Sequence, residues 1–414
     1  MSRPGQFGVE PGGGLSDRIA VGLLTGAFPP ELVDRVVARC GRQGQRNRLL
    51  TPKVTVYFVL TMCLFPGQGY REVARTLAGG LAWGRRCAAP GQVPSTAAIS
   101  RARLKLGAEP LRELFAEVAR PEPVQPVQPV QPVQPAEGAA GAGRAGWGGG
   151  ARYRGWRLVA VEGTVLDVPD SAENLAHFGP PETDGGYPRV RLVTLAECGG
   201  NAVTAAAAGP PSTAAPDLAR GLFDRLGGGD LVLADRGGFD DPASWRAASA
   251  GGADLLWRAG PDAVLPVCQK LSDGSYLTGA ALDGSYLTGV AVDGGAGAGA
   301  GAGGGTGAGG RGSGRGRVRA GVAVVRVVED SSAGGPGRLL TTILDPVRAP
   351  AAELAALHGG WSSGVTALRE LTDDQLGSVR VLRSCSPEGV EQEVWGHLLV
   401  HHAVGRLRAF GPAR

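Results

Sequence analysis

The chain has 414 residues, of which 43% are hydrophobic, so it is long enough to form two or three domains with a sizeable core. Six scattered cysteines without a C-x-x-C pair argue against a disulfide framework or a zinc site, and no apolar run is long enough to cross a bilayer, so we expect a soluble, cytoplasmic protein. The net charge of +4 is uneven, because residues 1–120 contain 17 Lys and Arg against 8 Asp and Glu. A basic segment of this kind favours a polyanion as partner.

The basic segment is predicted to be helical from residue 15 to about 120, after a disordered stretch over 1–14. A buried helix is expected over 52–65, and two helices over 94–120 are separated at Gly107. Ser95 can cap the first of these two, and Ile99, Leu104 and Leu106 are expected to form its apolar side.

A basic helix flanked by short helices is typical of helix-turn-helix-like DNA binding. The candidate DNA-contacting residues of this segment are Arg46, Arg48, Lys53, Arg101, Arg103 and Lys105. The alternative is that these charges merely solvate exposed helix faces.

The rest of the chain changes in character after a linker over 121–150, which begins with Pro-Val-Gln repeats and continues as a Gly/Ala-rich stretch. Residues 151–414 are predicted to be α/β, with a β-rich insertion over about 260–345 that contains a disordered Gly/Ala tract at 293–317. Strands are predicted at 157–162, 190–197, 201–208, 230–235, 253–258, 318–329 and 338–344. Helices are predicted at 213–226, 241–250, 350–373 and 387–408.

Two carboxylates stand at the ends of buried strands in this part of the chain. Glu162 ends the apolar run 158–161, and we expect a turn and a second strand to follow it. Asp235 ends the run LVLA at 231–234. Two carboxylates at neighbouring strand ends would suit a divalent cation with oxygen ligands, while the alternative is that each acid ends a strand or pairs with an arginine.

Several segments, in this order and spacing, resemble DDE transposases of the insertion-sequence-4 type. The resemblance lies in RIAVGLLTGAFPPELVDRVVARCG and GYREVARTL of the basic segment, in VAVEGTVLDVPDSAENLAHFG and LVLADRGGF around the two acids, and in the C-terminal LRSCSPEGVEQEVWGHLLVHHAVGRL. It implies an RNase H-like catalytic domain with a β-rich insertion, preceded by an all-α DNA-binding domain. It also implies double-stranded DNA with element terminal repeats as partner, a homodimer on DNA, Mg²⁺ or Mn²⁺ as cofactor, and a nucleoid-associated protein.

The acids of the family map unevenly onto this sequence. Asp235 matches the second acid and Arg236 beside it is a further candidate for DNA contact, whereas Glu162 stands where the family has Asp. The extra methylene moves the first carboxylate by roughly 1.5 Å, and metal coordination tolerates only a few tenths of an ångström. The third acid would fall at Gly364 or Val365, so its carboxylate is lost. We therefore expect impaired strand cleavage and transfer with Glu162 and Asp235 as residual metal ligands; the alternative is a non-catalytic DNA-binding relic or repressor of element ends.

Overall fold

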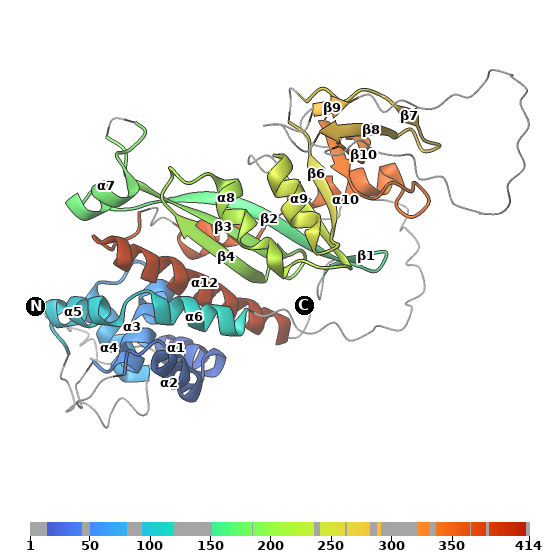
Figure 1. Cartoon of the computed structure of the whole chain (residues 1–414). Helices are drawn as coiled ribbons and strands as arrows, with labels where there is room; N and C mark the ends of the chain where they lie inside the picture. Colours follow the sequence, from blue (N-terminus) through green and yellow to red (C-terminus); the bar gives the residue numbers. More distant parts are fainter. Residues whose placement is uncertain are drawn as a thin grey trace, which may run out of the picture. The chain divides into compact units, whose positions relative to one another are not determined.

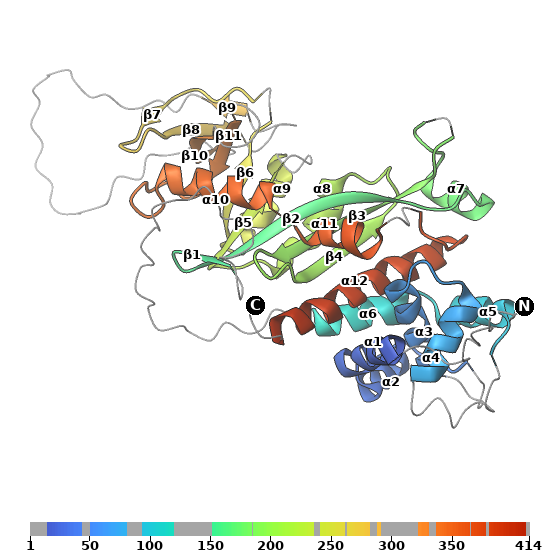
Figure 2. The same cartoon turned by 180° about the vertical axis from the view of Figure 1, so that it is seen from behind.

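The computed structural model of the protein describes residues 15–43, 50–80, 93–119, 151–183, 185–235, 241–260, 263–281, 288–290, 322–330, 337–364, 366–377 and 381–410. The predicted disordered stretches, the linker and the Gly/Ala tract lie outside these residues. The chain folds into two compact units (Figures 1 and 2). The first comprises Met1–Gly149, Gly163–Ala214 and Val365–Arg414, and the second comprises Gly150–Glu162 and Ala215–Gly364.

The basic segment of the first unit is helical, as predicted. Its helices are α1 (Leu15–Ala27), α2 (Pro30–Arg39), α3 (Pro52–Leu64), α4 (Tyr70–Gly80), α5 (Thr96–Leu106) and α6 (Glu109–Val118). The long C-terminal helix α12 (Pro387–Phe410) packs against α3 and α6. The helical segment therefore shares one core with the end of the chain, a tertiary feature that helix patterns do not specify.

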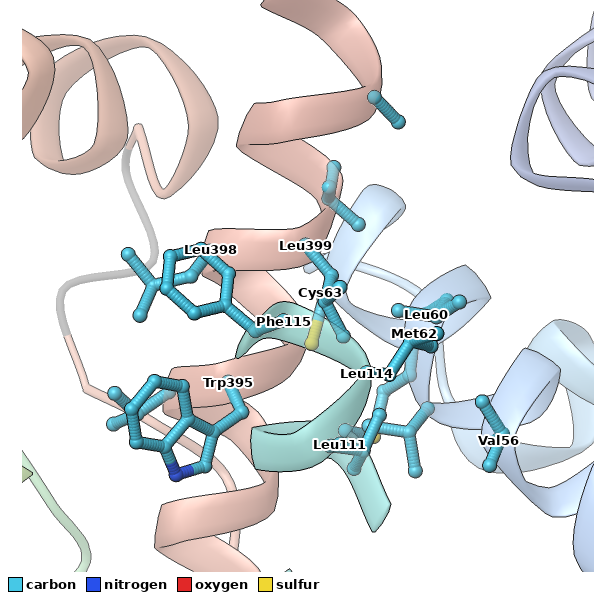
Figure 3. Close-up of a cluster of buried hydrophobic side chains, with 14 of the residues drawn as sticks. Val56, Leu60, Met62, Cys63, Leu111, Leu114, Phe115, Trp395, Leu398 and Leu399 are labelled. Carbon is cyan, nitrogen blue, oxygen red and sulfur yellow. The ribbon is translucent and has the colours of Figure 1, made fainter. Parts of the chain in front are cut away.

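Helix α3 lies at the centre of this core because nearly all of its length is apolar. Thr51 caps it by accepting a hydrogen bond from the amide of Val54 at 3.2 Å, and Pro52 occupies the first turn, where no N–H is needed. Residues 55–63 are all buried. Figure 3 shows side chains of α3, α6 and α12 filling the space between these helices, among them Leu60, Leu114 and Leu398.

The first unit also contains part of the sheet. Strands β3 (Arg189–Glu197) and β4 (Val203–Gly209) form an antiparallel pair. The order in this part is β4-β3-β2, where β2 (Trp156–Asp167) is the strand that passes from the second unit into the first at Gly163. Helix α7 (Ala172–Phe178) precedes β3, and the short helix α11 (Ala367–Arg369) continues into a π-helical turn over Glu370–Gln375. The two predicted strands are confirmed to within two residues.

The second unit is built on parallel strands that continue into an antiparallel insertion. Its strands are β1 (Arg152–Tyr153), β2 (Trp156–Asp167), β5 (Asp230–Ala234), β6 (Asp254–Arg258), β7 (Gln269–Lys270), β8 (Tyr276–Ala281), β9 (Thr288–Val290), β10 (Val322–Asp330) and β11 (Gly337–Thr341). Strands β2, β5 and β6 are parallel neighbours, and the order continues as β6-β11-β10-β8-β7 through antiparallel pairs. The predicted β-rich insertion thus extends the sheet beyond β6.

The helices of the second unit connect and cover these strands. They are α8 (Ala215–Arg220), a 3₁₀ turn (Phe223–Arg225), α9 (Pro242–Ala250) and α10 (Ala351–Ser363). Helix α10 packs against β10 (Figure 2). None of the helices in the part of the chain that the structure describes has the length and apolarity needed to cross a bilayer.

Two predicted boundaries were wrong. Strand β2 does not end at Glu162 but runs on to Asp167, because Leu166 is buried on the same strand and the backbone stays extended through Gly163 and Thr164. The predicted helix 350–373 is interrupted after Ser363, where Gly364 is extended with ψ of 178°. Both errors arose because a Gly residue permits a turn, an extended backbone or a helix end equally well.

Candidate active site

The register of β2 and β5 aligns the two acids singled out in the sequence, although only Asp235 directly follows the end of its strand. In the parallel pair β2/β5, Arg157 lies opposite Asp230 and Ala160 opposite Leu233. Ala160 and Leu233 are the last paired residues, and the same register continued by two residues aligns Glu162 with Asp235. Glu162 lies inside β2 and is partly buried, whereas the Asp235 side chain, directly after β5, is 38% exposed.

Asp235 is paired with an arginine of the next strand. Nε of Arg258, the last residue of β6, donates to Oδ1 of Asp235 at 2.7 Å. Nη2 of the same guanidinium donates to Oδ2 of Asp330, the last residue of β10, at 2.9 Å. The alternative of an acid–arginine pair at the strand end is therefore realised for Asp235.

A buried histidine of α10 completes this group. Nε2 of His358 lies 3.1 Å from the carbonyl oxygen of Ala234, and its Nδ1 lies 3.4 Å from Nη2 of Arg258. Burial lowers the pKa of His358, and the adjacent Arg258 lowers it further, although the bond to Ala234 and the nearby carboxylates act in the opposite direction. A neutral ring with its proton on Nε2 donates to Ala234 and accepts from Arg258, which matches both contacts.

Sequence reasoning missed Arg258, Asp330 and His358. Arg258 follows the apolar run LLW of β6, so it carried the same signal as Asp235, a charge at the end of a buried strand. Asp330 also ends a largely apolar strand, but nothing in the sequence shows that β10 and α10 reach the ends of β5 and β6.

The position predicted for the third acid provides no carboxylate. Gly364 is the C-cap of α10, with its amide donating to the carbonyl oxygen of Trp361 at 3.0 Å, and Val365 lies outside the described residues. The nearest acid on α10, Glu353, accepts from Nε of Arg154 at 2.9 Å and from the hydroxyl of Tyr153 at 2.8 Å. It is therefore held by the β1 hairpin.

Glu370, the next acid along the chain after α10, belongs to the first unit. It lies 3.0 Å from Nη1 of Arg408 and 3.4 Å from Nε2 of His401, both on α12. Burial alone would raise the pKa of Glu370, but hydrogen bonds from His401 and Asn201 and the charge of Arg408 outweigh it, so the pKa is lowered. Glu370 is thus an internal partner of α12.

These residues do not fit a three-carboxylate metal centre. Among the described residues, no group of three or more His, Cys, Asp or Glu side chains could hold a metal ion. The register of β2 and β5, continued past its last pair, aligns the oxygen donors Glu162 and Asp235, but Asp235 is already bonded to Arg258. A hard divalent cation takes six or more oxygen ligands, so water or a substrate would have to supply the others.

Of the seven predicted DNA-contacting residues, three are accessible, one is buried and three lie outside the described residues. Arg101 and Lys105 are exposed on α5, one turn apart, and Lys53 forms an ion pair with Asp34 on the surface of α2 and α3. Arg46, Arg48 and Arg236 lie outside the described residues. Arg101 and Lys105 thus remain accessible to phosphate groups.

Arg103 differs from its predicted role, because it is buried. It is only 5% exposed and donates to Gln392 at 3.0 Å, to the hydroxyl of Ser384 at 2.8 Å and to the hydroxyl of Tyr70. It therefore ties α5 to α4 and α12 and cannot reach DNA from this position. The spacing of three basic residues at i, i+2 and i+4 could have indicated this, since i+2 points to the opposite side of a helix.

The other predicted features of α5 are largely confirmed. Ser95 accepts from the amide of Ala98 at 3.2 Å, and Gly107, with φ of 74°, ends the helix in a conformation that favours glycine. Ile99 and Leu106 are buried as predicted, but Leu104 is 64% exposed. The buried face of α5 consists of Ile99, Arg103 and Leu106 instead.

Comparison with known proteins points to one class. Residues 18–116 match the family described as "Insertion element 4 transposase N-terminal". Over 386 residues the chain is 26% identical to "Transposase InsG for insertion sequence element IS4" of Escherichia coli (strain K12), an alignment that covers 91% of this chain and 74% of that protein.

Proposed function

From the premise that this chain is an insertion-sequence-4-type transposase, we propose that it binds the ends of its element and that its metal-dependent strand cleavage and transfer are impaired. The relative identified above acts as a transposase for its element, and transposases of this type generally depend on a divalent metal. Double-stranded DNA with terminal repeats would be the partner, two copies would assemble on it, and Mg²⁺ or Mn²⁺ would be the cofactor of any residual activity.

DNA binding is supported by the distribution of charge. The family match covers the basic segment, and Arg101 and Lys105 are exposed there on a single helix face. Lys and Arg contacts to phosphate supply most of the affinity for DNA, and each contact steepens the dependence of affinity on salt. This face of α5 is the part of the described structure that best fits such contacts.

An RNase H-like catalytic domain is supported by the sheet. The antiparallel pair β3/β4 and the parallel run β2-β5-β6 belong to one sheet, with Glu162 inside β2 and Asp235 directly after β5. In this scheme Glu162 and Asp235 occupy the positions of the first two metal ligands.

Impairment is supported chiefly by the third position, where Gly364 ends α10 and supplies no carboxylate. Metals bound at such a site would activate the oxygen that attacks the phosphodiester and stabilise the oxygen that leaves it. Loss of a single ligand or donor from such a site typically costs orders of magnitude in rate.

DNA binding is tested by removing two charges from α5. We expect Arg101→Ala/Lys105→Ala to weaken binding to the DNA that flanks the gene and to lower the slope of log K against log salt by about 2. The control is Arg225→Ala/Arg246→Ala, which removes two exposed arginines of the second unit and should leave the slope unchanged. Equal effects of the two double variants would contradict the assignment to α5.

Cleavage is tested with the same DNA in Mg²⁺ or Mn²⁺, beside an Asp235→Ala variant. We expect binding without nicks, which supports an impaired enzyme and, if cleavage is wholly absent, the alternative of a DNA-binding relic or repressor. Nicks at element ends that disappear in Asp235→Ala would refute the proposed impairment.

A further inference from the structure

We propose that Arg258 is a built-in counter-ion of Asp235. Its guanidinium balances the negative charge of this carboxylate in place of a divalent metal and so weakens metal binding at the acid pair. The inference rests on the proposed function only for the choice of Glu162 and Asp235 as the acid pair. It concerns the affinity of this site for metal, which can be measured without DNA.

The guanidinium is held from three directions at the edge of the sheet. Asp235 accepts from its Nε, Asp330 accepts from Nη2, and His358 faces the same Nη2 through its Nδ1. Each partner comes from a different element, β5, β10 and α10. A planar guanidinium with five donors can serve all three at once, whereas a lysine ammonium could not reproduce this fork.

Asp330 prevents the guanidinium from leaving easily. Its side chain is fully buried, and the Arg258 side chain is only 6% exposed. A buried carboxylate that loses its charge partner is strongly destabilised, because it has given up its hydration. Withdrawal of Arg258 to release Asp235 to a metal would therefore weaken the pairing of Asp330 at the same time.

Gly337 leaves the space that the guanidinium occupies. A Cβ placed at this first residue of β11 would lie 2.3 Å from Nη1 of Arg258, so any larger residue would push the guanidinium aside. The backbone of Gly337 is not in the left-handed region, so its conformation does not require glycine. The surroundings of Arg258 thus combine a buried carboxylate, a neutral histidine and the space left by Gly337. These contacts distinguish the Arg258–Asp235 ion pair from an exposed ion pair on the surface.

A divalent cation at Asp235 would have to compete with this arginine. Oδ1 of Asp235 already accepts a hydrogen bond from the guanidinium of Arg258. A metal bound to the same carboxylate would lie close to a second positive charge in a partly buried site, where such repulsion is screened less than in water. The expected consequence is weak metal binding despite two adjacent acids.

The test is Mn²⁺ binding, followed by electron paramagnetic resonance of the free ion, with the full-length protein. Arg258→Met/Asp330→Asn removes one positive and one negative charge, so the net charge of the site is unchanged. We expect this double variant to bind Mn²⁺ at least about tenfold more tightly than the wild type, a factor that corresponds to about 1.4 kcal/mol. Addition of Asp235→Asn should abolish the gain.

Two results would overturn the inference: equal Mn²⁺ affinity of the wild type and the double variant, or a gain that survives Asp235→Asn. If the double variant does not fold, Gly337→Ala decides the question, because it displaces the guanidinium and keeps every charge. We expect Gly337→Ala to tighten Mn²⁺ binding about threefold in an Asp235-dependent manner, and no change would contradict the proposal. DNA affinity through α5 is measured separately, so either proposal can fail without the other.

Discussion

At the residue scale, arginine serves this protein as an internal connector. Counted over the whole residue, Arg103, Arg258 and Arg326 are 5%, 8% and 0% exposed. Each of them binds acceptors from several segments of the chain. A guanidinium can satisfy up to five acceptor directions in one plane, so it can join chain segments that each carry few polar groups. The charge of a residue is therefore a poor guide to its role here, as Arg103 and its exposed neighbours on α5 illustrate.

At the same scale, Gly396 allows α12 to approach α3 closely. A Cβ at Gly396 of α12 would lie 2.6 Å from Sγ of Cys63 and 3.1 Å from Cγ1 of Val59, both on α3. We expect Gly396→Ala to destabilise the protein by about 1–2 kcal/mol, because overpacking outweighs the gain in helix propensity. Urea denaturation measures the change.

The matched control lies on the same helix. Nothing lies within 4 Å of a Cβ at Gly405, so Gly405→Ala should stabilise the protein by up to about 1 kcal/mol through helix propensity alone. Stabilisation by both substitutions would show that α3 and α12 do not pack as closely as described.

At the element scale, the insertion anchors the start of α10. Asp273 accepts from the amide of Ala351, the first residue of α10, at 2.8 Å, and it forms an ion pair with Arg326 of β10. Arg326 also donates to the carbonyl oxygen of Ala349 at 2.7 Å. Because Pro350 offers no side-chain cap, the insertion supplies the cap from a distance.

This anchor predicts a large effect from a small change. Asp273→Asn should destabilise the protein by about 3–5 kcal/mol, because Arg326 would be left fully buried without its charge partner. Hydrogen exchange at the first amides of α10 should accelerate. The carboxylate pKa of Asp273 is lowered, because hydrogen bonds from Ser275 and Ala351 and the charge of Arg326 outweigh the effect of burial, so the ion pair persists at neutral pH.

The control is the exposed ion pair on the same helix. Glu353 and Arg154 are 44% and 42% exposed, so Glu353→Gln should cost no more than about 1 kcal/mol. Equal costs for Asp273→Asn and Glu353→Gln would contradict the role given to Asp273.

At the scale of the whole molecule, buried neutral histidines couple folding to pH in both units. Burial lowers the pKa of His397 to about 3, with a smaller effect from Arg383, and lowers the pKa of His402 to about 4. In the second unit the pKa of His358 is lowered as well. Near pH 7 these rings are neutral in the folded and mostly neutral in the unfolded chain, whose histidines titrate near pH 6.5.

Stability should therefore fall on acidification between pH 6.5 and about 4. In this range the unfolded chain takes up protons that the folded chain excludes, and each such histidine contributes a slope of up to about 1.4 kcal/mol per pH unit. His397→Asn should reduce the slope of stability against pH by the contribution of one histidine, because Asn does not titrate. The Asn side chain can still accept from Nε2 of Gln375, which lies 3.0 Å from Nδ1 of His397. The exposed His177 is the control, and an equal flattening by His177→Asn would refute the assignment.

The sequence alone determined the helical character of the first segment and the positions of β3, β5 and β6. Hydrophobic periodicity marks helices and strands locally, so these elements can be predicted without their tertiary partners. The absence of a carboxylate at Gly364 and Val365 is likewise visible in the chain itself.

Only the tertiary structure decided what the charged residues do. Arg103 is buried because α5 packs between α4 and α12. Asp235 is paired with Arg258 because β6 reaches the end of β5, and β10 and α10 hold the guanidinium there. These interactions join residues up to 289 positions apart, so no local pattern records them. The physical reason is that periodicity specifies which face of an element is buried, whereas the partner of a buried charge depends on which distant element packs against that face.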